Sequence, residues 1–154
     1  LIKEFSNSDQ IIDVVGEGPE KESLQELAIK YNTNINFLGN LRHENLMNIM
    51  NQYRYFISSS LFEGNPKAIL EAMASGCLVL AVDIPNNSEV IKNNENGLLY
   101  QLEKDNLLNT FNKILLNEEL SKALSTNALK TVEANFSINK MINDEYSDLV
   151  ALSK

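Results

Sequence analysis

Short apolar runs alternate with helical patterns between Ile11 and Val82, and this alternation limits the possible folds more than any other feature of the chain. Helical spacing of apolar residues predicts helices at Pro19–Tyr31, Glu44–Gln52 and Pro66–Ser75. Runs rich in Val, Ile, Phe and Tyr predict strands at Ile11–Val15, Ile35–Leu38, Tyr55–Ser58 and Leu78–Val82. Strands and helices that alternate at this spacing favour a Rossmann-like, three-layer α/β/α fold, in which helices cover both faces of a parallel sheet.

The pattern changes after Gly97. It predicts a short extended piece at Leu98–Tyr100, an amphipathic helix at Leu107–Leu115, another helix from about Glu118, and a last helix capped by Ser137. Neither an internal repeat nor an interdomain linker is visible. Residues 1–154 are therefore predicted to form a single domain.

The loops that follow the predicted strands hold most of the glycines and prolines. In doubly wound folds, ligands bind outside the carboxyl ends of the strands, so polar residues in these loops are predicted to face a ligand. Taken alone, the first loop is better explained as a tight strand-to-helix turn, because its glycine spacing is not that of a dinucleotide fingerprint. The loops are Gly16–Pro19, Gly39–Arg42, Ser59–Asn65 and Asp83–Ser88.

Two carboxylates, Glu63 and Glu71, flank a predicted helix start. Asn65 is a favourable N-cap and Pro66 suits the first helical position, which puts Glu71 in the second turn. The unpaired N–H groups of the first turn form a site for an anionic ligand such as a phosphate. Glu71 lies among small and apolar residues, so its carboxylate needs a partner, and a sugar diol would serve.

Simpler interpretations exist for each candidate residue. Glu63 and Glu71 could instead be a helix-capping acid and an ion-paired glutamate. They do not match the paired carboxylates of a hydrolytic glycosidase, because a phosphate bound between them would separate them. His43 is predicted to cap a helix at the surface, because no nucleophile is near it in sequence. Cys77 is predicted to be a buried small hydrophobic residue rather than a reactive thiol.

Composition excludes several classes of function. A formal net charge of −8 argues against a nucleic-acid-binding surface and against electrostatic adhesion to anionic lipid. No signal peptide is visible in this sequence, and no apolar run in it approaches the length needed to cross a bilayer. A single cysteine fits a reducing compartment, and the lack of Cys/His clusters makes a zinc site improbable. We therefore expect a cytoplasmic protein without a bound metal.

Several motifs, taken together, resemble the C-terminal, donor-binding domain of the family-four retaining glycosyltransferases of GT-B fold. The resemblance covers essentially the whole chain, and the two-glutamate motif is its most specific part. The motifs occur in order at Val15–Glu20, Phe37–Gly39, His43–Glu44, Ser60–Pro66, Leu70–Gly76, Ser88–Ile91 and Asn96–Leu99.

The resemblance implies a role for each matching residue. Glu63 would lie at the reacting anomeric carbon, and Glu71 would accept hydrogen bonds from the ribose of the nucleotide. Amides near Ala68 and Ile69 would meet the diphosphate, which is stabilised without a metal cofactor. The glycines would permit close approach of the nucleotide, and the residues after Glu63 would line the sugar. The glycines are Gly16, Gly18 and Gly39, and the residues that would line the sugar are Gly64, Asn65 and Pro66.

Three departures from the family pattern are visible. The opening strand of the family domain, with the basic loop that neutralises the diphosphate, would precede Leu1 and is absent. Leu78 stands where proline is common, and Asp83–Asn87 replaces a glycine-rich loop. The resemblance therefore implies a domain truncated at its N-terminus, separated from the N-terminal domain that binds the acceptor. Such a fragment should fold without turning over substrate.

The resulting functional prediction is a sugar transfer. The full-length protein would move a sugar from a nucleotide diphosphate to an acceptor with retention at the anomeric carbon, in bacterial polysaccharide or glycolipid assembly at the inner face of the membrane. The alternatives are a non-catalytic nucleotide-sugar-binding module and a nucleotide-sugar epimerase of the same fold.

Overall fold

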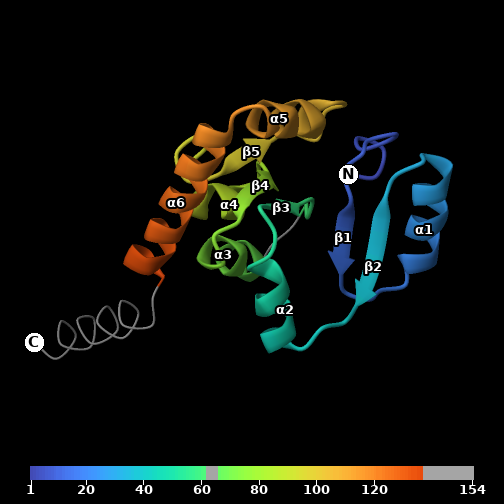
Figure 1. Cartoon of the computed structure of the whole chain (residues 1–154), viewed down its shortest axis with the longest axis horizontal. Helices are drawn as coiled ribbons and strands as arrows, with labels where there is room; N and C mark the ends of the chain where they lie inside the picture. Colours follow the sequence, from blue (N-terminus) through green and yellow to red (C-terminus); the bar gives the residue numbers. More distant parts are fainter. Residues whose placement is uncertain (62–65, 137–154) are drawn as a thin grey trace, which may run out of the picture.

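The computed structural model describes residues 1–61 and 66–136. Strands and helices alternate through most of this part of the chain, as the sequence predicts (Figure 1). The elements in chain order are β1 (Ile12–Val15), α1 (Lys21–Lys30), β2 (Ile35–Gly39), α2 (His43–Met50), β3 (Tyr55–Ser58), α3 (Lys67–Ala74), β4 (Leu78–Val82), α4 (Pro85–Val90), β5 (Leu98–Tyr100), α5 (Asn106–Leu115) and α6 (Glu118–Asn135).

Every strand pair is parallel, which confirms the predicted sheet type. Within the described residues the strands form two sheets, one of β1 and β2 and one in the order β3-β4-β5. The prediction of a parallel sheet covered by helices did not specify its continuity, and the described strands divide it in two. In Figure 1 the two-stranded sheet and α1 lie to one side of the larger sheet.

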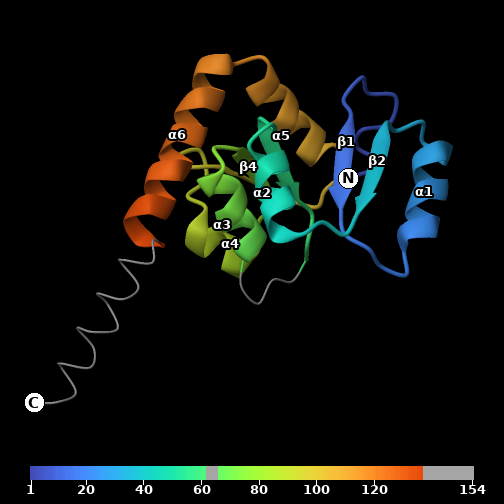
Figure 2. The same ribbon diagram turned by 60° about the horizontal axis from the view of Figure 1, so that its bottom comes forward.

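The centre of the larger sheet is β4, whose residues Leu78–Val82 are all at most 2% exposed. Two apolar cores pack against it, and burying each large side chain contributes roughly 1.5–3 kcal/mol relative to leaving it in water. One core includes Leu80, Phe111 and Leu124; the other includes Ile69, Met73 and Val79. Helices thus cover both faces of the sheet, as a fully apolar strand requires (Figure 2).

The N-terminal segment, residues 1–9, joins the two sheets. On one side the hydroxyl of Thr33 donates to the carbonyl oxygen of Ile2 at 2.8 Å. On the other, the Glu4 carboxylate accepts hydrogen bonds from the backbone amides of Asp105 and Leu108, at 2.7 and 3.2 Å. Glu4 therefore caps the start of α5 from more than a hundred residues away.

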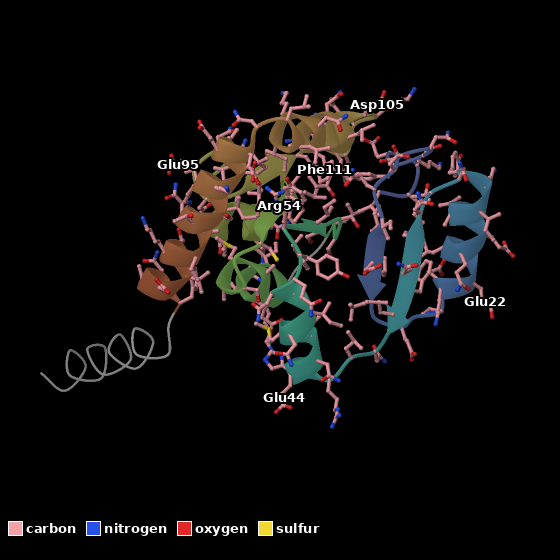
Figure 3. All side chains as sticks on the ribbon, in the orientation of Figure 1. Glu22, Glu44, Arg54, Glu95, Asp105 and Phe111 are labelled. Carbon is pink, nitrogen blue, oxygen red and sulfur yellow. The ribbon has the colours of Figure 1, made fainter. Side chains whose placement is uncertain are left out.

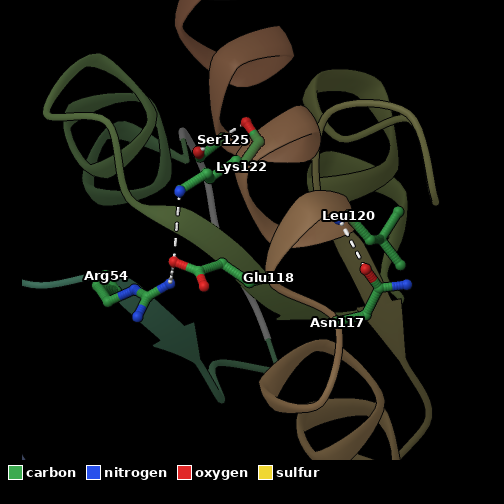
Figure 4. Close-up of polar contacts among 6 residues, drawn as sticks. All are labelled: Arg54, Asn117, Glu118, Leu120, Lys122 and Ser125. Atoms are coloured by element: carbon green, nitrogen blue, oxygen red, sulfur yellow. Dashed lines mark hydrogen bonds and ion pairs between the residues drawn. The ribbon is translucent and has the colours of Figure 1, made fainter.

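Local sequence explains how α6 begins (Figure 4). The side chain of Asn117 accepts a hydrogen bond from the amide of Leu120 at 3.0 Å, a regular N-cap contact. Glu118 directly follows Asn117, and its carboxylate lies 3.3 Å from Lys122, one turn further on, and 3.3 Å from Arg54. These two cations lower the pKa of Glu118, although the group is too exposed for the pairs to add much stability.

Most predicted elements are confirmed with shifts of one or two residues at their ends, where helices fray. The expected helix stop at Gly76 is confirmed by its positive φ of 80°. Pro66 was expected to be the first helical residue. Instead it occupies the N-cap position, with a non-helical ψ of 48°, and α3 begins at Lys67. The helix predicted from Ser137 lies outside the described residues.

The segment Asp83–Ser88 was expected to be a loop, and this was wrong: α4 occupies Pro85–Val90. Proline at its first position needs no hydrogen-bonded N–H there. The side chain of Asn87 is fully buried and donates to the carbonyl oxygen of Val82 at 2.9 Å, which ties this short helix to the end of β4. The sequence of α4 carries no apolar stripe, so periodicity could not reveal it.

Candidate functional site

The first two strands end at glycines that lie side by side. The amide of Gly16, directly after β1, donates to the carbonyl oxygen of Gly39, the last residue of β2, at 2.8 Å. Both glycines have positive φ, 127° and 69°, so a side chain at either would be strained. A Cβ on Gly16 would meet no atom within 4 Å, so the space beside this backbone is open. Open space is what close approach of a ligand needs.

Gly18 behaves differently from these two. Its φ is not in the left-handed region, and a Cβ there would also meet nothing within 4 Å. No backbone strain therefore demands glycine at this position. Its predicted role in nucleotide binding stays a prediction.

Within the described residues, the first amide groups of α3 have no partner inside the helix. The first intrahelical bond runs from the amide of Leu70 to the carbonyl oxygen of Pro66 at 3.0 Å, so the amides of the preceding residues have no partner inside the helix. Ala68 is exposed at this tip, whereas the side chain of Ile69 is 1% exposed. Backbone groups at a helix start attract anions, so this tip can hold a phosphate.

Glu71 is the most enclosed acid near this tip, with its side chain 17% exposed. Its Oε1 lies 3.5 Å from Nζ of Lys67 and 3.7 Å from Nδ1 of His43. Both distances exceed a good hydrogen bond, and the side chains of Lys67 and His43 are both mostly exposed. Such pairs are worth about 1 kcal/mol or less, so a ligand hydroxyl could replace them at small cost.

The structure thus brings His43 and Lys67 to Glu71, which the sequence interpretation missed. His43 is exposed, as expected, but it is the first residue of α2 rather than its N-cap, and its imidazole faces Glu71. Nothing in the local sequence indicates this contact, because α2 and α3 are separated by β3. Lys67 was detectable, since it precedes Glu71 by four residues on the same helix.

Three predicted site residues, Glu63, Gly64 and Asn65, lie outside the described residues. Pro66, the fourth member of that segment, is half-buried before α3. Their roles at the sugar and at the anomeric carbon stay predictions.

The polar residues after β4 bind one another. The Asp83 carboxylate accepts hydrogen bonds from the hydroxyl of Ser88 at 2.8 Å and from the side-chain amide of Gln101 at 2.9 Å. The hydroxyl of Tyr100 donates to the carbonyl oxygen of Ser58 at 3.0 Å. These contacts fix the carboxyl ends of β3, β4 and β5 relative to one another.

Two features of the described residues bear on metal binding and on membrane insertion. Residues 1–61 and 66–136 hold no group of three or more His, Cys, Asp and Glu side chains arranged to bind a metal ion. Across the same residues, none of the helices combines the length and hydrophobicity that a bilayer crossing demands.

Cys77 is 1% exposed, which confirms the prediction of a buried, hydrophobic-like residue. Burial raises the pKa of its thiol from 9.0 to about 11. The folded protein therefore keeps this proton at a pH where the unfolded chain loses it, so the contribution to stability is complete below pH 9 and is lost as the pH rises through 11.

We expect the free energy of unfolding to fall between pH 9 and pH 11, and to fall less steeply in Cys77→Ala, which lacks the thiol. Urea denaturation followed by circular dichroism at each pH measures both slopes. Burial also raises the pKa of Tyr100, to about 12, and this contribution is common to both proteins. Equal slopes in the two proteins would contradict the expectation.

Known proteins resemble this chain in sequence and in structure. A UDP-N-acetylglucosamine–peptide N-acetylglucosaminyltransferase GtfA subunit from Streptococcus agalactiae is 36% identical over 92 residues, covering 59% of this chain and 18% of that protein. The Escherichia coli UDP-Gal:alpha-D-GlcNAc-diphosphoundecaprenol alpha-1,3-galactosyltransferase is 28% identical over 150 residues, covering 92% of this chain and 38% of that protein. This chain thus spans less than two-fifths of the length of either relative.

Among solved structures, Anabaena HepE in complex with UDP superposes with a TM-score of 0.85 at 21% identity, covering 98% of this chain and 44% of that one. This likeness confirms the expected fold. The family model described as "Glycosyl transferases group 1" matches residues 1–131. This match covers every described strand and most of α6, and on this evidence the chain belongs to the group 1 glycosyl transferases.

Proposed function

We propose that this chain is the nucleotide-sugar-binding domain of a retaining glycosyltransferase. One observation carries the proposal: Glu71 and the first amides of α3, which have no partner inside the helix, lie together after β3 in a chain of the group 1 family. A diphosphate suits a helix start, and a ribose diol suits a carboxylate whose present partners are weak.

In the proposed complex the diphosphate binds the amides near Ala68 and Ile69, and Glu71 accepts hydrogen bonds from the ribose hydroxyls. Gly16, Gly18 and Gly39 leave room for the nucleoside. The open space beside Gly16 supports this placement. With the diphosphate at the start of α3, the sugar would lie near the residues that precede this helix.

The reaction centre would include Glu63, beside the developing positive charge of the anomeric carbon. Gly64, Asn65 and Pro66 would contact the sugar. The helix start and nearby cations, in place of a metal, would stabilise the leaving diphosphate. We also propose that the transfer retains the configuration at the anomeric carbon.

The donor is proposed to be a uridine diphosphate sugar. The names of the two relatives above specify UDP-N-acetylglucosamine and UDP-Gal, and the HepE structure holds UDP. The acceptor would be bound by a further domain that precedes residue 1 in the whole protein, on the cytoplasmic side of the membrane. This arrangement agrees with the fraction of each relative that the chain spans.

Calorimetric titration of residues 1–154 with UDP, GDP and ADP tests donor binding. We expect UDP to bind with a Kd between about 1 μM and 1 mM, roughly −8 to −4 kcal/mol, because a basic loop that would neutralise the diphosphate is not in this sequence. A chain that binds none of the three nucleotides would argue against a donor-binding domain. Sub-micromolar binding would show that the basic loop is unnecessary.

A further inference from the structure

A lysine occupies the first position of α3, at the end of the helix where a positive charge is least favourable. Lys67 begins this helix, and its side chain is 76% exposed. The aligned peptide dipoles of a helix leave its start partly positive, and the amides of the first turn carry that charge. A cation at this end is therefore disfavoured until an anion lies beside it.

Other helices of the chain begin in the opposite manner. Their first turns contain acids: Glu22 in α1, Glu44 in α2, and Glu118 with Glu119 in α6. Figure 3 labels Glu22 and Glu44 near the starts of their helices. The first turn of α3, residues 67–70, contains Lys67 and no acid. Helix stability therefore does not account for a lysine at this position.

The contact between Lys67 and Glu71 does not account for it either. The two residues are four positions apart with the cation first, and this order stabilises a helix less than the reverse order. On α6 the acid comes first, at Glu118, and Lys122 follows. Glu71 also has a second neighbour, His43, at 3.7 Å. Lys67 can thus leave Glu71 at small cost.

An ammonium at this position suits a phosphate. Lys67 directly precedes Ala68 and Ile69, whose amides would contact the diphosphate in the proposed complex. A lysine ammonium has three N–H donors on a flexible stem, so it can turn from a carboxylate to a phosphate oxygen without a change in the backbone. Its charge also offsets part of the repulsion between an anionic nucleotide and a chain of formal net charge −8.

We propose that Lys67 is a donor-binding residue of this domain, and that its ammonium moves from Glu71 to the diphosphate when the nucleotide binds. This inference rests on the proposed function and names a cation at its diphosphate site. The exchange pairs the leaving diphosphate with a positive charge. It also frees the carboxylate of Glu71 to accept hydrogen bonds from the ribose.

The exchange connects both halves of the nucleotide to one pair of side chains. Without the ligand, Lys67 and Glu71 are each other's partners at 3.5 Å. With the ligand, each has a better partner, because a diphosphate carries more charge than one carboxylate and ribose hydroxyls can approach Glu71 at regular hydrogen-bond distances. Recognition of the ribose and recognition of the diphosphate are then coupled.

Titration of the chain 1–154 with UDP, followed by NMR of the backbone amides, measures the contribution of Lys67. We expect Lys67→Gln to weaken UDP binding by at least about tenfold, because a hydrogen bond from a charged donor is lost. Lys67→Arg keeps a cation at this position, so it should lose less affinity than Lys67→Gln.

Lys122→Gln is the matched control. Lys122 is also an exposed lysine four residues from its acid, so its loss changes the net charge by the same amount (Figure 4). Glu118 joins it to Arg54, which precedes β3. Because α3 connects the parallel strands β3 and β4, it begins at the opposite end of β3. The affinity for UDP should therefore be unchanged in Lys122→Gln.

The Glu71→Gln background separates a direct contact from an indirect one. A lysine that acts only by holding Glu71 has no effect on UDP binding once that carboxylate is removed, whereas a lysine that contacts the diphosphate still contributes. We expect Lys67→Gln to weaken UDP binding both in the unmodified chain and in Glu71→Gln. Equal or tighter binding of UDP in either comparison would overturn the inference.

Failure of the proposed function gives a different result. If neither the unmodified chain nor any variant binds UDP, the donor-binding proposal is wrong and the assignment of Lys67 is wrong with it. If the unmodified chain binds UDP and Lys67→Gln binds it equally well, the domain still binds its donor, and only the assignment of Lys67 is wrong.

Discussion

Replacing Phe111 by alanine is expected to lower the free energy of unfolding by about 3–5 kcal/mol. Phe111 is 4% exposed and packs edge-to-face against two aromatic rings. Its ring centroid lies 5.3 Å from that of Phe5 and 5.1 Å from that of Tyr55. The truncation would remove apolar packing and both ring contacts, which connect the N-terminal segment to β3.

Urea denaturation followed by circular dichroism measures this loss. The loss would be a large part of the total stability of a domain this size, about 5–15 kcal/mol. Leu116→Ala is the matched control, because Leu116 is 88% exposed and its truncation should change stability by about 0.5 kcal/mol or less. A loss below about 1 kcal/mol in Phe111→Ala would mean that the core reorganises around the missing ring.

Glu71→Gln is expected to weaken UDP binding by roughly 10- to 150-fold, because a hydrogen bond from a hydroxyl to a carboxylate contributes about 1.5–3 kcal/mol. The substitution keeps the size of the side chain and removes its charge. Glu44→Gln is the matched control, since Glu44 is an exposed acid in the first turn of α2. Its affinity for UDP should equal that of the unmodified chain.

A second ligand makes the assignment specific to the ribose. The unmodified chain should bind 2′-deoxy-UDP more weakly than UDP, whereas Glu71→Gln should bind the two about equally, because the carboxylate that distinguishes them is gone. Titration of both proteins with both ligands completes the cycle. Undiminished binding of UDP by Glu71→Gln would assign Glu71 to its contacts with Lys67 and His43 instead.

Local pattern was enough to predict the parallel strands and most helices. Val-rich runs such as Leu78–Val82 have one stable environment, a strand covered on both faces. The short α4 was missed because its stability comes from a buried contact between Asn87 and Val82, which leaves no periodic signal. The separation into two sheets was not part of the prediction, since edge pairing depends on which strands meet in space.

The candidate site divides in a similar way. The motif around Glu71 and the glycines at the ends of β1 and β2 could be recognised from residue type and spacing. The contact between His43 and Glu71 could not, because it joins two helices with a strand between them. The capping of α5 by Glu4 could not be predicted either, because Glu4 and Asp105 are far apart in the chain.

The sequence by itself determined the α/β class, the strand positions and the acid at the head of α3, because these follow from local spacing and residue chemistry. Only the tertiary structure decided that the tip of α3 shares its surroundings with His43, and that the described strands divide into two parallel sheets. Such features depend on residues far apart in the chain, and local hydrophobic periodicity carries no information about which distant elements meet.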